Sequence, residues 1–193
     1  MGHHLLLWDA PNIDMTLSNI IEGKPDPRTR PDLDVLAKWL VAQADEHDTV
    51  EACIFVNVPS HLTGPLRGWV LWLLDTGFRV FAKPKVGDSD VDQDMLDHLE
   101  RSERDAQLSA VYVGSNDAKN FLEPLEDLAH RDVAVHALGF GEYAGGLAQS
   151  DLVDFIDLES VTGLFAQSLP RLTLDSLPPA GQWFEPRVSL SQR

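Results

Sequence analysis

Carboxylate and amide side chains gather at three places where an apolar segment of this 193-residue chain ends. Asp9 and Asn12 follow the first such segment, and Ser115, Asn116 and Asp117 follow a later one. A third segment runs into Lys83 and Lys85 and then four aspartates: Asp88, Asp90, Asp92 and Asp94. Convergent carboxylates repel unless a proton or a cation lies between them, and their hard oxygens suit Mg²⁺ or Mn²⁺. Since a bound cation can position a phosphate and stabilise a leaving oxygen, the pattern predicts metal-dependent phosphodiester chemistry.

Other common chemistries have little support in the chain. Cys53 is the only cysteine, and its apolar surroundings in Ala-Cys-Ile-Phe-Val predict a buried structural thiol. The histidines show no paired ligand spacing, and we leave His3 and His4, directly after Met-Gly, out of the metal argument. No nucleophile-elbow motif supports a serine triad, and Gly139-Phe-Gly141 is too weak to be a dinucleotide fingerprint.

The composition narrows the class of partner. The formal net charge of −16 opposes general nucleic-acid binding, because affinity for phosphates normally comes from lysine and arginine. A carboxylate cluster that holds divalent cations would resolve this conflict, because the cations then meet the phosphates. No apolar run approaches the roughly 20 residues of a membrane span, and a secretory signal is not evident. We therefore expect a cytoplasmic protein without a membrane partner.

The elements that must position these side chains alternate along the chain. Apolar patterns predict strands over 5–8, 52–58, 78–82, 108–113, 133–138 and 155–158. Helical spacing marks segments near 33–44, 66–76, 91–104 and 121–129, while 9–12 is expected to enter a loop and a short helix to precede the last strand. This alternation predicts an α/β fold with a parallel sheet covered on both faces. In such sheets the functional crevice lies outside the carboxyl ends of the strands, where the polar residues fall.

Two regions are expected in the domain organisation. Residues 5–166 should form one domain, and 167–193 a Pro-containing extension that packs on the domain or on a partner. Trp69 and Trp72 in the segment 66–76 are interpreted as core residues, or as the face of a homodimer if too much apolar surface remains exposed.

The phase of the helix expected over 91–104 indicates which of its aspartates point towards the sheet end. Its buried face is defined by Val91, Met95 and Leu99. Asp92 falls beside that face in the first turn, where it would point over the end of the sheet. Asp90 precedes the helix and could cap it, and Asp94 is intermediate. Which of these three binds a metal stays open, with Asp92 favoured.

Three stretches of the chain resemble one known family. Trp-Asp9-Ala-Pro-Asn12 resembles the opening Asp-x-x-Asn motif of NYN domains, a branch of the PIN-like nuclease superfamily. Lys85 followed by Asp90-Val-Asp92-Gln-Asp94 resembles the second motif of that family. Ser115-Asn-Asp117 followed by Asn120-Phe resembles the third, with Asn120 where the family has a second acid. The resemblance covers roughly residues 5–165, in the order of the family.

The resemblance implies a three-layer, Rossmann-like PIN-type fold with strand order 3-2-1-4-5. It also implies Mg²⁺ or Mn²⁺ as cofactor and single-stranded RNA as substrate. The catalytic residues would be Asp9, Asp92 and Asp117, with Asp90 as a further metal ligand. The substrate-binding positions would be Asn12, Lys85, Ser115, Asn116 and Asn120.

Three functions remain open from the sequence. The leading hypothesis is a metal-dependent ribonuclease of the NYN type. The alternative is a non-catalytic RNA-binding or regulatory module with a degenerate NYN site, because Asn120 removes one expected charge. A third hypothesis, a metal-dependent phosphohydrolase acting on small substrates, fits the lack of a broad basic groove.

Overall fold

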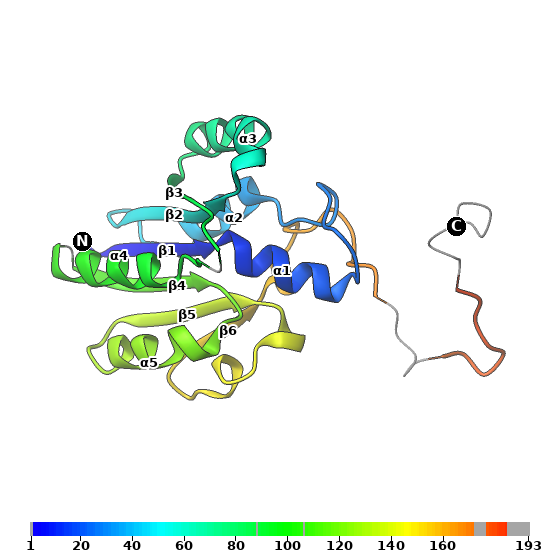
Figure 1. Cartoon of the computed structure of the whole chain (residues 1–193). Helices are drawn as coiled ribbons and strands as arrows, with labels where there is room; N and C mark the ends of the chain where they lie inside the picture. The colour runs from blue at the N-terminus through cyan, green and yellow to red at the C-terminus, as the bar shows by residue number, and fades with distance from the viewer. Residues whose placement is uncertain (1, 88, 106, 172–176, 185–193) are drawn as a thin grey trace.

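A parallel sheet forms the centre of the molecule. The computed structural model describes residues 2–87, 89–105, 107–171 and 177–184, so Asp88 lies outside the described residues. Within them the strands are β1 (His3–Asp9), β2 (Thr49–Val58), β3 (Arg79–Pro84), β4 (Leu108–Gly114), β5 (Ala134–Gly139) and β6 (Asp154–Asp157). All neighbouring strands pair in parallel, in the order β3-β2-β1-β4-β5-β6. The expected order is confirmed, and β6 extends it beside β5 (Figure 1).

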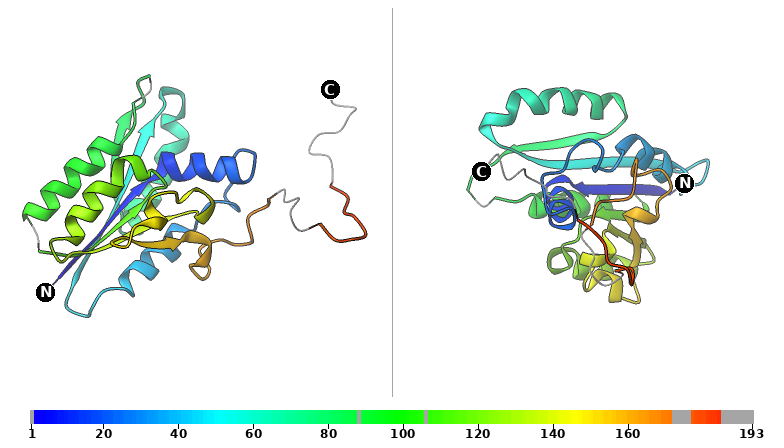
Figure 2. Two further views of the ribbon diagram at one scale, coloured as in Figure 1. Left: turned by 90° about the horizontal axis from the view of Figure 1, so that it is seen from below. Right: turned by 90° about the vertical axis from the view of Figure 1, so that its right-hand side faces the viewer.

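Helices cover both faces of the sheet. They are α1 (Ala10–Ile20), α2 (Leu33–Val41), α3 (Thr63–Asp75), α4 (Asp92–Asp105) and α5 (Ala118–Ala129). Figure 2 shows α4 and α5 on one face and α2 on the other. Alternation along β1 explains the two cores: Leu6 packs with α1 and α2, whereas Leu5 and Leu7 pack under α4 and α5. Asp9 has the parity of Leu7, and it therefore points towards the α4 side.

The predicted faces of α4 and β2 agree with the structure. Val91, Met95 and Leu99 are buried under α4, as the helical spacing predicts. Cys53 is also buried, as expected for a structural thiol. Helical periodicity over two turns and a strongly apolar strand both predict burial well, because each pattern requires only one packed face.

The segment after β1 was predicted wrongly as a loop. It is helix α1, which begins directly at Ala10, with Pro11 in the first turn, where a missing backbone N–H costs nothing. Asp9 caps this helix, and its carboxylate accepts a hydrogen bond from the backbone N–H of Asn12 at 3.0 Å. The missed signal was Asp-x-Pro followed by Ile13, Leu17 and Ile20, which recur at helical spacing and are buried.

The connection from β5 to β6 contains short 3₁₀ helices, Gly141–Tyr143 and Leu147–Gln149, where a short helix was expected. In the extension, Leu169 is buried in the core, whereas Trp183 is 94% exposed and lies away from the domain (Figure 1); packing of the extension on a partner stays a prediction. Residues 172–176 and 185–193 of that extension lie outside the described residues. Across the described ranges, no helix combines the length and apolarity needed to cross a membrane.

Candidate metal centre

Asp9 lies at the switch point of the sheet, where the chain leaves β1 between β2 and β4. Its neighbour Trp8 pairs with Gly114, the last residue of β4, so Ser115 comes next to Asp9. The Ser115 hydroxyl donates to Asp9 Oδ2 at 3.3 Å, while the Asn12 backbone holds Oδ1. Asp9 is only 2% exposed and Ser115 is fully buried. The carboxylate of Asp9 is therefore fixed in orientation and shielded from solvent.

Burial disfavours the charged form of Asp9. It raises the pKa of Asp9 from 3.8 to about 7; the backbone hydrogen bond from Asn12 opposes this rise, and the negative charge of Asp92 adds to it. The two carboxyl groups are hydrogen-bonded to each other, and this contact raises the pKa of Asp9 and lowers that of Asp92. Asp9 is therefore the acid of the pair that takes up a proton more readily. A divalent cation can take the place of that proton, because it satisfies both carboxylates at once.

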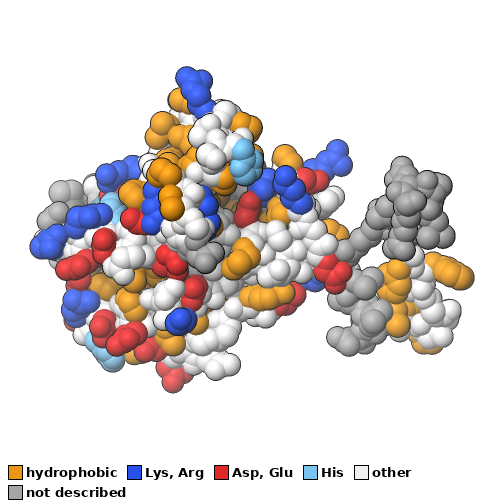
Figure 3. Space-filling view, viewed as in Figure 1, with side chains coloured by type: hydrophobic (Ala, Val, Ile, Leu, Met, Phe, Trp, Pro, Cys, Tyr) orange, Lys and Arg blue, Asp and Glu red, His pale blue; other side chains and the backbone are white. Residues whose placement is uncertain are grey.

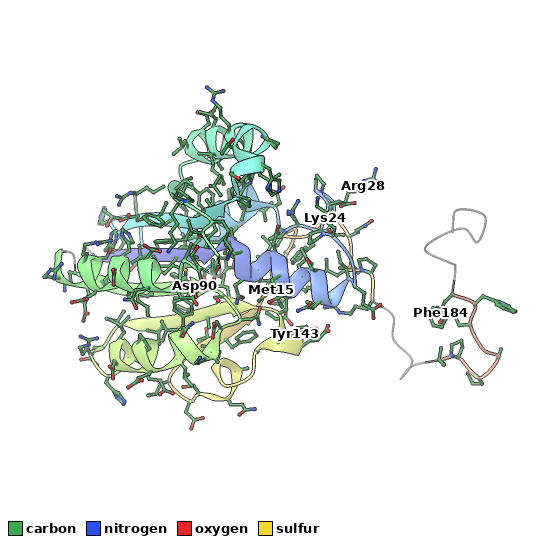
Figure 4. The ribbon with its side chains drawn as sticks, in the orientation of Figure 1. Met15, Lys24, Arg28, Asp90, Tyr143 and Phe184 are labelled. Carbon is green, nitrogen blue, oxygen red and sulfur yellow. The ribbon has the colours of Figure 1, made fainter. Side chains whose placement is uncertain are left out.

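Asp92 comes to Asp9 from the first turn of α4. The pKa of Asp92 is also raised, chiefly by burial, and the charges of Asp90 and Asp117 add to the effect. Asp90 itself is exposed in the segment before α4. In the view of Figure 4 Asp90 lies near the middle of the domain.

Asn120 links the two remaining acids. Its Nδ2 donates to Asp92 Oδ2 at 2.6 Å and to Asp117 Oδ2 at 3.1 Å. Asp117 caps α5, and its Oδ1 accepts from the backbone N–H of Lys119 and Asn120. The amide thus stabilises both carboxylates, and its hydrogen bond lowers the pKa of Asp92.

The three acids do not form a closed triangle. Among the described residues, Asp9, Asp92 and Asp117 do not each bring an oxygen within 4.8 Å of the other two. The mutual approach that we expected from the sequence holds for Asp9 and Asp92, while Asn120 lies between Asp92 and Asp117. The residues present therefore fit a divalent cation at the Asp9–Asp92 pair, with Asp117 as a more distant acid.

Asn12 and Asn116 hold the rim of the site together. Asn12 Oδ1 accepts from the backbone N–H of Asn116 at 2.9 Å, which ties α1 to the loop after β4. The side chain of Asn116 in turn forms two hydrogen bonds with the backbone of Phe140. Both residues were predicted to bind substrate; their hydrogen bonds also give them a structural role, and substrate binding stays a prediction. Gly139 is required here, because a Cβ atom at that position would lie 2.7 Å from Asn116 Nδ2.

The lysines near the site are engaged with the protein. Lys83 Nζ pairs with Asp94, and Lys85 Nζ donates to the backbone oxygen of Ser89 in the loop before α4. Asn57 at the end of β2 donates to the same oxygen at 3.0 Å. Its own Oδ1 is the one buried side-chain polar atom without a hydrogen-bond partner in the described part of the chain. Asn57 follows a strand as the acids do, and that position could have drawn attention to it.

Two exposed side chains that the sequence did not single out lie on segments that follow β1 and β5. Met15 on α1 is 58% exposed, and Tyr143 in the turn after β5 is 42% exposed. In the view of Figure 4 both lie to the right of Asp90. A hollow of about 270 Å³ lies elsewhere, between α4 and α5, beside Leu96 and Pro124. Asp9, Asp92 and Asp117 do not line this hollow.

Comparison with known proteins adds information on the fold. No protein-family model matches the chain, and no curated protein matches its sequence. The fold is similar to the crystal structure of a protein of unknown function from Vibrio parahaemolyticus, with a TM-score of 0.62 and 19% sequence identity. The match covers 82% of this chain and 94% of the other. At this identity the likeness supports the α/β architecture alone.

Proposed function

We propose that this chain is a metal-dependent ribonuclease of the NYN type, which cleaves single-stranded RNA by phosphodiester hydrolysis. The observation that carries the proposal is the contact between the buried carboxyl of Asp9 and Asp92 at the sheet switch point. A scaffold that needed only stability would not place a half-buried acid against a buried one, because the pair costs free energy unless a proton or cation joins it. Perturbed acids at such a position are typical of functional sites.

The residues divide into ligands and supports. Asp9 and Asp92 would hold Mg²⁺ or Mn²⁺, with Asp90 and Asp117 as the next acids within the cluster. The cation would supply an activated water and stabilise the leaving oxygen. Ser115 orients Asp9 through its hydroxyl. Asn12 and Asn116 keep α1 and the loop after β4 in register.

Single-stranded RNA is the substrate class that the rim favours. Tyr143 offers an exposed ring, and bases of a single strand stack on aromatic side chains. Lys85 is exposed near the start of α4, whereas Lys83 is neutralised by Asp94. With a net charge of −16, few cations are available to bind phosphates. We therefore expect few contacts between basic side chains and the RNA phosphates, and weak RNA binding in the absence of the metal.

One observation favours the alternative function. Asn120 donates to Asp92 and Asp117, so the acids are partly satisfied without a cation. A non-catalytic RNA-binding or regulatory module would need only this arrangement. The contact between Asp9 and Asp92 opposes that reading, because an unused site has no reason to keep a buried carboxyl with a raised pKa.

Cleavage assays separate the two functions. The full chain should cleave labelled single-stranded RNA with Mn²⁺ or Mg²⁺, and a chelator should abolish cleavage. Asp9→Asn and Asp92→Asn should each reduce cleavage by about 100-fold or more, as loss of a group that stabilises transition-state charge does. The matched control is Asp97→Asn, since Asp97 lies on the same helix and bonds only Gln93 among the hydrogen bonds found there.

The other outcomes have distinct meanings. Intact RNA that is retained in a shift assay, equally with and without chelator, would assign the non-catalytic function. Hydrolysis of a chromogenic phosphodiester without RNA cleavage would assign a phosphohydrolase of small substrates. Equal RNA cleavage by the wild type, Asp9→Asn and Asp92→Asn would place the activity in a contaminant. We further propose a cytoplasmic location without a membrane partner, which fractionation of cells tests directly.

A further inference from the structure

A second group of metal-binding side chains lies away from the acids. Glu51 and Cys53 are two residues apart on β2 and point to the same side, and His98 on α4 meets them from above. The pairing register sets Cys53 beside Leu7, whereas Phe55 lies beside Asp9. The Phe55 ring also contacts the His98 ring edge-on, with 6.0 Å between centroids. The group is therefore distinct from the candidate centre at Asp9.

The ligand atoms form a nearly equilateral triangle. Cys53 Sγ lies 3.3 Å from Glu51 Oε1 and 3.4 Å from His98 Nε2, and the remaining side, His98 Nε2 to Glu51 Oε1, is 3.6 Å. A point equidistant from the three atoms lies about 2 Å from each, close to zinc bond lengths of about 2.0–2.3 Å. Ligand pairs in a tetrahedral zinc site are separated by roughly 3.3–3.6 Å for the same bond lengths. The side chains are thus already at coordinating separations.

The donor set has a clear preference among metals. A thiolate and an imidazole are borderline-soft ligands that select zinc over Mg²⁺ or Mn²⁺, and a carboxylate completes many zinc sites. Glu51 and His98 keep 21% and 18% of their side chains exposed, which gives a metal ion access from solvent. Cys53 is buried below them.

Other uses of the same residues fit less well. Burial raises the pKa of the Cys53 thiol to about 12, with the charge of Glu51 adding to the effect, so the thiol is a poor nucleophile at neutral pH. A disulfide needs a second cysteine, and Cys53 is the only one in the chain. A cation would convert the same thiol to a strong ligand.

Neighbouring side chains orient the carboxylate of Glu51. His3 Nε2 lies 3.5 Å from Oε2, and His3 Nδ1 is held by the Thr49 hydroxyl at 2.7 Å. This leaves Oε1 for Cys53 and His98, in the way that outer partners fix metal ligands. Arg79 also donates to Oε1 and would compete with a cation, but its side chain is 69% exposed and free to turn into solvent.

We propose that Glu51, Cys53 and His98 form a zinc site that clamps α4 to β2. The clamp holds the helix that begins at Asp92. His98 lies six residues after Asp92, roughly 9 Å along the helix axis. Zinc would therefore stabilise the fold and fix the position of α4 over the sheet, whatever reaction the acids catalyse.

Cobalt substitution tests the thiolate directly. The full chain, stripped of metal, is titrated with Co²⁺, and a sulfur-to-cobalt charge-transfer band should appear at one equivalent. Cys53→Ser should lose that band. Asp9→Asn should keep it, which separates this site from the acids. Absence of a band that depends on Cys53 would overturn the proposal.

Zinc affinity gives a second readout that does not require a change in the core. Competition with a chromogenic chelator should show that His98→Gln weakens zinc binding by more than about 100-fold, because even outer partners of zinc ligands contribute about 10–100-fold. His61→Gln, an exposed histidine on another segment, is the matched control and should not change affinity. Arg79→Ala should tighten binding several-fold, since it removes a competing cation. Equal affinity in the wild type and His98→Gln would show that the group is only a hydrogen-bonded network.

Discussion

The side-chain amide of Asn120 lies 2.6 Å from a carboxylate oxygen of Asp92, although 28 residues separate them in the chain. The same nitrogen reaches Asp117, so one amide joins α4 to α5 through two carboxylates. An acid at this position would repel both neighbours, whereas an amide attracts both. The residue that departs from the NYN pattern is therefore the one that lets the acids approach without a cation.

Asn120→Asp should lower the stability of the metal-free protein and raise its affinity for Mn²⁺. Without metal, the new charge repels Asp92 and Asp117, so the melting temperature at pH 8 should fall by several degrees. With Mn²⁺, the additional carboxylate should raise affinity by about 10-fold or more, because ligand charge tunes the affinity of such sites. Calorimetry and thermal melts measure both effects. Asn120→Ala, which removes the amide without adding charge, should lower stability and leave Mn²⁺ affinity without this gain.

Asp9→Asn should stabilise the metal-free protein at high pH. Raising the pKa of Asp9 from 3.8 to about 7 means that its charged form costs on the order of 4 kcal/mol in the folded state. That cost is complete above pH 7, shrinks as the pH falls towards 4, and vanishes once the unfolded state is protonated as well. Asparagine keeps the bond from the Asn12 backbone N–H through its amide oxygen, and its amide nitrogen can donate to the Ser115 hydroxyl, both without charge. Chemical unfolding in chelator should therefore show a gain of a few kcal/mol at pH 8 and almost none at pH 4; a gain independent of pH would contradict the assignment.

Mn²⁺ should raise the melting temperature through the Asp9–Asp92 pair. Binding to the folded state alone stabilises a protein in proportion to the logarithm of ligand concentration over Kd. The shift should disappear in Asp92→Asn and persist in Asp97→Asn on the same helix. A shift of equal size in both variants would move the Mn²⁺ site away from α4.

Gly139→Ala should disrupt the rim of the site. The new Cβ would lie 2.7–2.9 Å from atoms of the Asn116 amide, which holds the backbone of Phe140. We expect a loss of about 1–3 kcal/mol in unfolding free energy from overpacking, with reduced RNA cleavage. Gly68→Ala is the control, because its site in α3 is open, and it should gain up to about 1 kcal/mol.

The homodimer stays a prediction, now with a defined surface. Trp72 was expected in the core, but it is 43% exposed on α3, next to exposed Leu71 and Leu74. Figure 3 shows apolar side chains gathered over α3. A self-complementary dimer would cover this face. Sedimentation should show a dimer that Trp72→Glu converts to a monomer, while Trp183→Glu leaves it intact. A monomer at every concentration would exclude the dimer.

Strand ends were the most informative feature of the sequence. Asp9 and Ser115 could be placed at one edge because parallel strands share the direction of their carboxyl ends. Asp92 could be placed by helical phase from Val91, Met95 and Leu99. The helix after Asp9 was missed because Pro11 suggests a turn, and only the buried face of α1 outweighs that signal.

Residue types and spacing by themselves determined the α/β class, the strand order through the NYN resemblance, and the edge at which the acids lie. These features are periodic or directional, and a linear chain records them. Only the tertiary structure decided which side chains touch: that Asp9 meets Asp92, that Asn120 lies between Asp92 and Asp117, and that Glu51, Cys53 and His98 converge. Such contacts join residues on different elements, and their pKa values depend on burial, which no local pattern encodes.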